Sequence, residues 1–139
     1  MNSPQEYLSY VRILVARTRG VQGLTVVQEQ SKDDVGLYRY RLQLTNGDML
    51  EAFEWYRIHA GRVEVGKYSF HWQDPEGLLI ARWDNAPHHP ELSTFPHHIH
   101  DGVDGDVKPH GPTRIEDVLT MVAHRLREVD ESGQSSLRS

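Results

Sequence analysis

Apolar residues recur every three or four positions near the start of the chain, a spacing that predicts an amphipathic helix. Ser3 suits the N-cap, Pro4 the first helical position and Gly20 the C-terminal end. The apolar face of this predicted helix consists of Tyr7, Leu8, Val11, Leu14 and Val15. We therefore expect the chain to open with a helix that buries one face.

The following sixty residues alternate between apolar and polar side chains, which is the pattern of half-buried strands. At Gly66 this alternation slips by one position and indicates a local irregularity. Short turns separate the strand-like runs, which favours antiparallel neighbours. The runs lie at 24–30, 38–44, 49–58, 63–72 and 78–84.

The Asn-Gly dipeptide at 46–47 is a strong signal for a two-residue hairpin loop. Such a loop pairs Tyr40 with Phe53 across an apolar face, which we assign to the core. The opposite face carries Arg39 and Arg41 and is mixed in character. We expect that mixed face to be open to solvent or to a partner, including a second copy of the chain in a homodimer.

A second amphipathic stretch follows the sequence Pro112–Glu116, which has the form of a capping box. Its apolar stripe consists of Ile115, Val118, Leu119, Val122, Leu126 and Val129. The segment 130–139 has little to bury and is expected to be a disordered tail. The chain is thus predicted to be a single α+β domain over 1–129: an antiparallel β-meander of about five strands with N-terminal and C-terminal helices packed on one face.

Composition narrows the classes of protein to which the chain can belong. A length of 139 residues suits one domain, and the formal net charge of −5 gives no global signature of nucleic-acid binding, although a local basic patch stays possible. There are no cysteines, which excludes disulfides and thiolate metal sites. No apolar run is long enough for a membrane span, and the N-terminus lacks the features of a signal peptide. We expect a cytoplasmic protein that does not contact membranes.

Histidines are concentrated in one segment. Six of the nine histidines lie between His71 and His100. Pro87, Pro90 and Pro96 exclude a regular helix in the segment 84–101 and do not suit a central strand. We therefore expect a stiff, irregular, histidine-rich loop at 84–101, and a loop of this kind can present functional side chains that a scaffold positions.

The first chemistry that fits this loop is general acid–base catalysis on RNA. Two imidazoles can move both protons of phosphodiester cleavage near pH 7 without a metal cofactor, and the 2′-hydroxyl of RNA supplies the nucleophile. The candidate catalytic residues are His97, His98, His100, His88, Glu91 and Asp84. The candidate phosphate-binding residues are Arg82, Arg39 and Arg41.

The second chemistry is binding of a divalent metal, as in a metal-dependent hydrolase or a structural site. The nitrogen and oxygen donors in the loop suit zinc or iron, although their spacing matches no standard metal motif. The candidate ligands are His88, His89, His98, His100 and Asp101. Adjacent histidines in an extended chain point to opposite sides, whereas His98 and His100 would share one side.

Two further interpretations need no catalysis. The loop could dock a macromolecule as a binding module, with Phe95 and Trp83 stacking on bases or packing against a protein. Alternatively, the imidazoles serve only the structure, because they can bridge backbone groups in a segment that lacks ladder hydrogen bonds. The sequence leaves these alternatives open.

Three motifs resemble the signature of TumE-type toxins from bacterial and archaeal toxin–antitoxin pairs. They are Lys67–Asp74, Arg82–Glu91 with its Pro-His-His-Pro-Glu, and Thr94–His100 with its Phe-Pro-His-His-Ile-His. Ile99 stands where many relatives are expected to carry lysine, which removes one cation from the argument for phosphate contact. The resemblance implies a small cytoplasmic protein that restrains growth and is neutralised by a co-encoded antitoxin, often a helix-turn-helix DNA-binding protein.

The resemblance does not supply a catalytic mechanism. Many toxins of this size cleave RNA, and the histidine-rich loop suits that chemistry, so we predict a ribonuclease toxin by chemical analogy. RNA and an antitoxin are the predicted partners. The outer face of the hairpin at 37–58 could serve a homodimer, and an exposed strand edge could equally receive an antitoxin segment.

Overall fold

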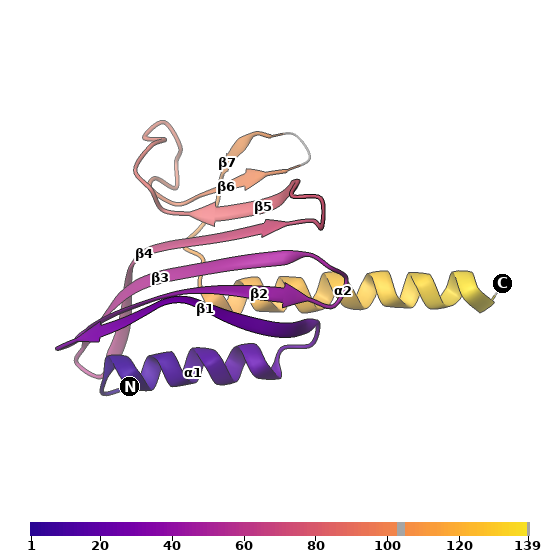
Figure 1. Cartoon of the computed structure of the whole chain (residues 1–139). Helices are drawn as coiled ribbons and strands as arrows, with labels where there is room; N and C mark the ends of the chain where they lie inside the picture. Colours follow the sequence, from indigo (N-terminus) through magenta and orange to yellow (C-terminus); the bar gives the residue numbers. More distant parts are fainter. Residues whose placement is uncertain (103–104, 139) are drawn as a thin grey trace.

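The computed structural model of the chain describes residues 1–102 and 105–138, with side chains described up to residue 128. Seven antiparallel strands form one sheet in which spatial order follows chain order, and both helices lie on one face (Figure 1). The α+β meander is therefore confirmed, with seven strands in place of about five. The elements are α1 (Pro4–Arg17), β1 (Val21–Lys32), β2 (Val35–Leu44), β3 (Met49–His59), β4 (Arg62–Gln73), β5 (Leu79–Asp84), β6 (His98–Asp101), β7 (Val107–Pro109) and α2 (Ile115–Arg138).

The predicted cap of α1 is confirmed. Ser3 Oγ accepts a hydrogen bond from the Glu6 amide at 3.1 Å, and a Glu6 carboxylate oxygen accepts one from the Asn2 amide at 2.9 Å. Pro4 occupies the start of the helix, where its missing N–H costs nothing. These contacts fix where α1 begins and so direct its apolar face toward the sheet.

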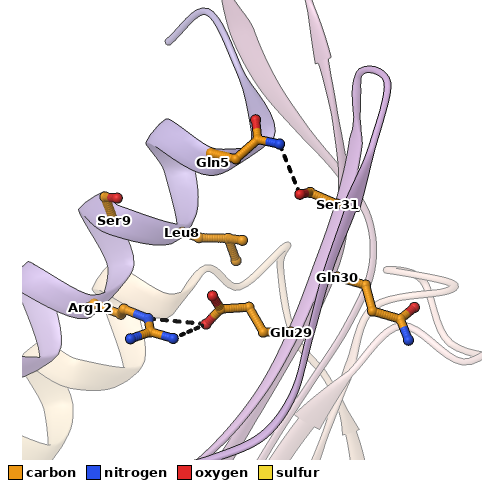
Figure 2. A pocket seen from close by; sticks show the side chains of 7 residues that line it. All are labelled: Gln5, Leu8, Ser9, Arg12, Glu29, Gln30 and Ser31. Carbon is orange, nitrogen blue, oxygen red and sulfur yellow. Dashed lines mark hydrogen bonds and ion pairs between the residues drawn. The ribbon is translucent and has the colours of Figure 1, made fainter.

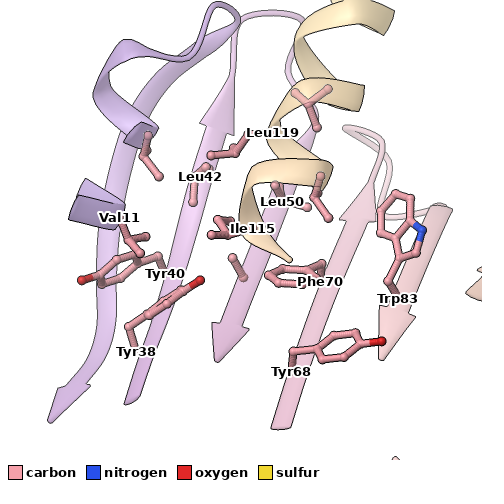
Figure 3. Close-up of a cluster of buried hydrophobic side chains, with 14 of the residues drawn as sticks. Val11, Tyr38, Tyr40, Leu42, Leu50, Tyr68, Phe70, Trp83, Ile115 and Leu119 are labelled. Carbon is pink, nitrogen blue, oxygen red and sulfur yellow. The ribbon is translucent and has the colours of Figure 1, made fainter. Parts of the chain in front are cut away.

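The core lies between the sheet and the two helices. Figure 3 shows Val11 of α1 and Ile115 of α2 over the same face of the sheet as Tyr40 and Leu42. All four of these side chains are fully buried. Burial of this apolar surface is the main force that holds both helices against the sheet, because most of the stability of a helix in a protein comes from tertiary packing of its apolar face.

The predicted register of the hairpin between β2 and β3 is wrong by one residue. Tyr40 lies opposite Ala52 rather than Phe53. The loop has three residues, 45–47, instead of two, because the Leu44 amide bonds to the Asp48 carbonyl and the Gly47 amide to the Leu44 carbonyl. A slip of one residue exchanges the two faces of a strand, so Phe53 lies away from the helices.

The corrected register puts a carboxylate in the core. Glu54 is fully buried, and its Oε1 accepts hydrogen bonds from the hydroxyls of Tyr7 and Tyr38, each at 2.6 Å. The other oxygen, Oε2, has no hydrogen-bond partner among the described residues. Burial raises the pKa of Glu54 to about 7, although the two tyrosine hydrogen bonds oppose the shift.

The irregularity predicted at Gly66 is confirmed as a bulge in β4. Trp55 pairs with Lys67 and the next residue, Tyr56, pairs with Val65, so Gly66 has no partner in β3. A Cβ at Gly66 would lie 2.7 Å from the Trp55 ring. The close approach of the indole explains why glycine occupies this position.

The end of the predicted loop is a strand rather than an irregular segment. β6 pairs with β5 so that His98 lies opposite Asp84 and His100 opposite Arg82. β7 then pairs with β6 on the other side. The histidine-rich region thus becomes the continuation of the sheet, which positions its side chains by backbone pairing.

The second helix extends further than its apolar stripe. α2 begins at Ile115 as predicted and continues to Arg138, past the predicted end at residue 129. Side chains from 129 onward lie outside the described part of the chain, so the disorder of the tail at 130–139 stays a prediction. Neither described helix combines the length and the apolar character that crossing a membrane requires.

Candidate functional site

The sheet face that is turned away from the helices carries cations from several strands. Arg39 and Arg41 project from β2, Lys67 from β4 and Arg82 from β5, at positions that alternate with core residues. This grouping is a local basic surface on a chain whose formal net charge is −5. A surface of this kind attracts phosphates even when the whole protein is acidic.

Asp84 is the centre of the histidine cluster. Its buried carboxylate lies 2.9 Å from His98 Nε2 through Oδ1 and 3.1 Å from Arg82 Nε through Oδ2. The Ala86 amide donates to Oδ1 at 3.0 Å. His100 Nε2 is 3.6 Å from Oδ2. The pairing of β5 with β6 brings these groups together, and all of them except Ala86 are among the candidates that sequence reasoning named.

His98 is held by acceptors on both sides of its ring. The imidazole is only 2% exposed, and Nδ1 lies 2.9 Å from the Pro96 carbonyl oxygen, which can only accept a hydrogen bond. Nε2 faces the Asp84 carboxylate. Both ring nitrogens therefore lie within hydrogen-bond distance of an oxygen, which fixes the orientation of the imidazole.

His100 and His89 complete the cluster with His98. Their ring centroids lie 4.9 Å and 5.0 Å from that of His98. The His100 side chain is 28% exposed and is therefore accessible to a ligand. Burial lowers the pKa of the His100 imidazole, although the Asp84 carboxylate opposes the shift. His100 is accordingly a neutral imidazole near pH 7, able to accept a proton.

His97 faces a different neighbourhood from His98. Its Nδ1 lies 2.8 Å from the hydroxyl of Tyr68, a residue of the core, and the two rings stack with centroids 5.8 Å apart. Burial lowers the pKa of His97, and the charge on His98 lowers it further. The predicted alternation of adjacent histidines therefore holds at 97–98, and His97 braces the segment against the core.

The remaining predicted residues lie outside the cluster. His88 and Glu91 are exposed, and Glu91 contributes only through a 3.3 Å contact with His89 Nδ1. Asp101 pairs with Lys108 at 3.3 Å. Arg41 pairs with Glu51 at 3.1 Å. The structure thus brings His89, rather than His88 or Asp101, to His98 and His100.

A cavity of about 560 Å³ adjoins the cluster. Arg82 and Asp84 belong both to its wall and to the histidine cluster, so the two are contiguous. Among its lining residues, sequence reasoning had selected Arg39, Arg82 and Asp84 as site candidates and Phe95 as a stacking residue, but it assigned no role to Phe53 or Lys67. Phe53 was missed because the hairpin register was wrong, whereas the parity that Lys67 shares with Ser69 and His71 in β4 is a signal that could have found it.

A hollow of about 350 Å³ between α1 and β1 is structural in character (Figure 2). Arg12 donates to Glu29 at 2.6 Å, and Gln5 donates to Ser31 at 2.9 Å. These polar side chains are occupied by one another and tie the helix to the edge strand. The hollow also lies on the helix-covered side of the molecule, away from the histidine cluster.

Three histidines meet a simple geometric test for metal binding. One nitrogen from each of His89, His98 and His100 lies within 4.8 Å of the other two. His98 Nδ1 faces the Pro96 carbonyl and His89 Nδ1 faces Glu91, while His98 Nε2 lies 2.9 Å from the Asp84 carboxylate, a contact that a metal bound through this nitrogen would replace. Metal-binding histidines commonly use their second nitrogen in this way. The residues therefore fit a divalent transition metal as well as proton transfer.

Comparison with known proteins agrees with the sequence motifs. The family described as Toxin TumE matches residues 11–132. No curated protein and no solved structure matches the chain. Because the family match extends over most of the chain, the protein belongs to the TumE toxin family.

Proposed function

We propose that this toxin acts on RNA as a ribonuclease and that the histidine cluster around Asp84 is its reaction centre. The observation that carries the proposal is the position of His100. Its accessible imidazole is held beside the buried His98–Asp84 pair and next to a cavity walled by cations. This arrangement supplies a proton acceptor and positive charge at one place, as phosphodiester cleavage requires.

The reaction that these groups support is attack by the 2′-hydroxyl on the adjacent phosphorus. His100 takes the proton from the 2′-hydroxyl as the bond from that oxygen to phosphorus forms. His89, whose Nδ1 faces the Glu91 carboxylate, delivers a proton from Nε2 to the departing 5′-oxygen as its bond to phosphorus breaks. The products are a 2′,3′-cyclic phosphate and a free 5′-hydroxyl, and the two proton transfers balance.

Arg82 and the buried pair have supporting roles. Arg82 is tied to Asp84 at 3.1 Å and its Nη1 lies 3.4 Å from His71 Nδ1, so its guanidinium has a defined direction. A guanidinium held in this way stabilises the charge that develops on the phosphoryl oxygens. His98 is too deeply buried to touch substrate and acts as a positioning residue between Pro96 and Asp84.

The decisive test is total RNA incubated with the purified protein and with His100→Ala, each with and without EDTA. We expect cleavage by the unaltered protein in EDTA and a loss of about 10²-fold or more in His100→Ala. His124→Ala is the matched control, because His124 is an exposed histidine on α2 that pairs only with Glu128 among the described residues. Intact RNA in every arm would refute the ribonuclease proposal.

A metal-dependent hydrolase is the second candidate, favoured by the 4.8 Å grouping of His89, His98 and His100. A bound metal would supply a Lewis acid or an activated water at this position. In the same experiment EDTA would then abolish cleavage. Metal analysis of the purified protein separates the two mechanisms, because a stoichiometric metal that His89→Ala loses is expected only for the second.

Membership of a toxin family implies an antitoxin partner. We propose that this antitoxin is a helix-turn-helix DNA-binding protein, as the sequence resemblance implies. The homodimer and the surface that receives the antitoxin stay predictions. If RNA stays intact in every arm, we would instead interpret the histidine cluster as a surface that binds a macromolecular partner without catalysis.

A further inference from the structure

We propose that the cavity beside the histidine cluster is a subsite for one nucleotide of single-stranded RNA, with the base stacked on Phe95 and the phosphate held by Lys67 and Arg39. The inference rests on the proposed ribonuclease function, since it names how the substrate is held at the same site. It is independent of which groups transfer protons. Binding and cleavage can therefore be tested separately.

The cavity combines two kinds of lining. Its apolar wall is made by Phe53, Pro87, Phe95 and Pro96, and its cations are Arg39, Lys67 and Arg82. Its volume of about 560 Å³ lies within the range of small-ligand sites. An apolar wall with a cationic rim matches a nucleotide, which has a flat base at one end and a phosphate at the other.

Phe95 is suited to stacking because it is exposed on a braced segment. Its side chain is 45% exposed, so the face of the ring is accessible to a base. The Phe95 amide donates to the Leu92 carbonyl at 3.1 Å, and Thr94 Oγ1 donates to the His97 carbonyl at 2.7 Å. These bonds restrain the backbone on both sides of the ring, directly before the histidines of β6.

The cations are oriented toward the cavity by their neighbours. The Arg39 guanidinium lies 4.6 Å from the centroid of the Phe53 ring and also contacts Glu51 at 3.3 Å. Lys67 is exposed, and within the described residues no carboxylate lies within ion-pair distance of its ammonium group. A phosphate can therefore pair with Lys67 without displacing an existing partner.

Asn85, which lines the cavity, is engaged by the backbone, and this favours a weak preference for RNA sequence. Asn85 Oδ1 accepts from the Tyr68 amide at 3.0 Å, and Asn85 Nδ2 donates to the Gly66 carbonyl at 3.0 Å. Its amide is thus engaged with the backbone and is not free to read a base edge. Every base has a face that can stack on an aromatic ring. We therefore expect the cavity to distinguish single-stranded from double-stranded RNA rather than one RNA sequence from another.

Single-stranded RNA is the occupant that these features favour. In a duplex the bases are stacked on each other and cannot reach an aromatic ring on the protein. An acidic protein segment would use the cations but would gain nothing specific from an exposed phenyl ring. The two occupants therefore differ in their dependence on Phe95.

The test is equilibrium binding of a fluorescent single-stranded RNA whose 2′-oxygens are methylated, so that the 2′-hydroxyl nucleophile is absent. We expect Phe95→Ala to weaken binding about tenfold or more and Phe95→Tyr to restore it, because tyrosine keeps the stacking face. Leu78→Ala is the matched control, since Leu78 is an apolar residue that is 63% exposed and lies outside the cavity.

A second pair of variants tests the phosphate contact. Lys67→Ala should weaken binding several-fold and reduce the slope of log affinity against log salt by about one. Arg62→Ala removes the same charge from an exposed position of the same strand, outside the cavity, and should leave the slope nearly unchanged. A double-stranded form of the same RNA should bind more weakly than the single strand.

The outcomes separate the subsite from the reaction. Binding that depends on Phe95 and Lys67, combined with no cleavage of unmodified RNA, would retain the subsite and refute the ribonuclease. The subsite alone would be overturned if the unaltered protein cleaves unmodified RNA but Phe95→Ala and Lys67→Ala bind the methylated RNA as tightly as their control variants do. Absence of RNA binding, or binding of an acidic peptide that Phe95→Ala leaves unchanged, would also overturn it.

Discussion

His98 and Asp84 face each other across two neighbouring strands, with Nε2 of the imidazole 2.9 Å from Oδ1 of the carboxylate. Both side chains are buried, and the second nitrogen of His98 is held by the Pro96 carbonyl. Removing one member of a buried charged pair leaves the other without compensation. This pair is therefore expected to contribute to stability as well as to the arrangement of the site.

The coupling between His98 and Asp84 can be measured with a double-mutant cycle. Asp84→Asn is expected to lower the free energy of unfolding by about 3 kcal/mol, because it removes the buried carboxylate that His98 and Arg82 both contact. The variants Asp84→Asn, His98→Gln and their combination should be compared by urea unfolding. We expect the double variant to lose at least about 1 kcal/mol less than the sum of the single losses. Strictly additive losses would show that the two groups do not interact.

Asp34→Asn provides the control for removal of a carboxylate. Asp34 is exposed in the turn between β1 and β2. An exposed substitution of this kind should change the free energy of unfolding by less than about 0.5 kcal/mol.

The adjacent residues His88 and His89 distinguish the structure from the sequence-based prediction. His89 lies in the cluster beside His98 and His100, whereas His88 is exposed outside it. We expect His89→Ala to reduce RNA cleavage about 10²-fold and His88→Ala to have a much smaller effect, since only His89 is placed to transfer a proton. Initial rates on one labelled RNA give both values. Equal losses in the two variants would contradict the assignment of His89.

Glu54 makes the stability of the fold depend on pH. Its pKa in the folded protein is raised to about 7 from an ordinary value of 4.5, so the folded state binds the proton more tightly than the unfolded state. The protonated Glu54 carboxyl contributes its full stabilisation at pH values below the pKa of Glu54 in the unfolded chain. This stabilisation is lost as the pH rises through the pKa of Glu54 in the folded protein. We expect unfolding at pH 5.5 to cost about 2 kcal/mol more than at pH 8 because of this group.

Glu54→Gln isolates this contribution. Its amide oxygen can still accept from the hydroxyls of Tyr7 and Tyr38, but the side chain no longer titrates. Glu116 also has a raised pKa through burial and remains in both proteins, so the difference between them reports Glu54 together with its electrostatic coupling to Glu116. Urea unfolding at pH 5.5 and pH 8 should show the smaller pH dependence in the variant. An unchanged pH dependence would mean that Glu54 does not titrate in this range.

Gly66 is expected to be intolerant of a side chain. A Cβ there would lie 2.7 Å from the Trp55 ring, so Gly66→Ala must displace the indole and should cost about 1–3 kcal/mol of stability. At Gly111 the same added Cβ meets nothing within 4 Å, which makes Gly111→Ala the matched control. Thermal unfolding of the two variants gives the comparison, and similar melting temperatures would show that the bulge adapts.

The sequence by itself determined the types and order of most elements. Helical spacing and capping residues identified α1 and the start of α2, and alternation with a slip at Gly66 identified β4 and its bulge. These features are local, since they depend on which residues are neighbours along the chain. The motifs within 67–101 were also sufficient to indicate the TumE family, which the family match confirms.

The tertiary structure decided which face each strand presents and which histidines meet. The hairpin register follows from a three-residue loop rather than from the two-residue loop that the Asn-Gly dipeptide predicts, and it moves Phe53 to the outer face and Glu54 into the core. The pairing of β6 with β5 selects His98 and His100 and directs His97 elsewhere. Pairing between segments depends on contacts that local periodicity does not encode, so a shift of one residue changes every side chain that reaches the site.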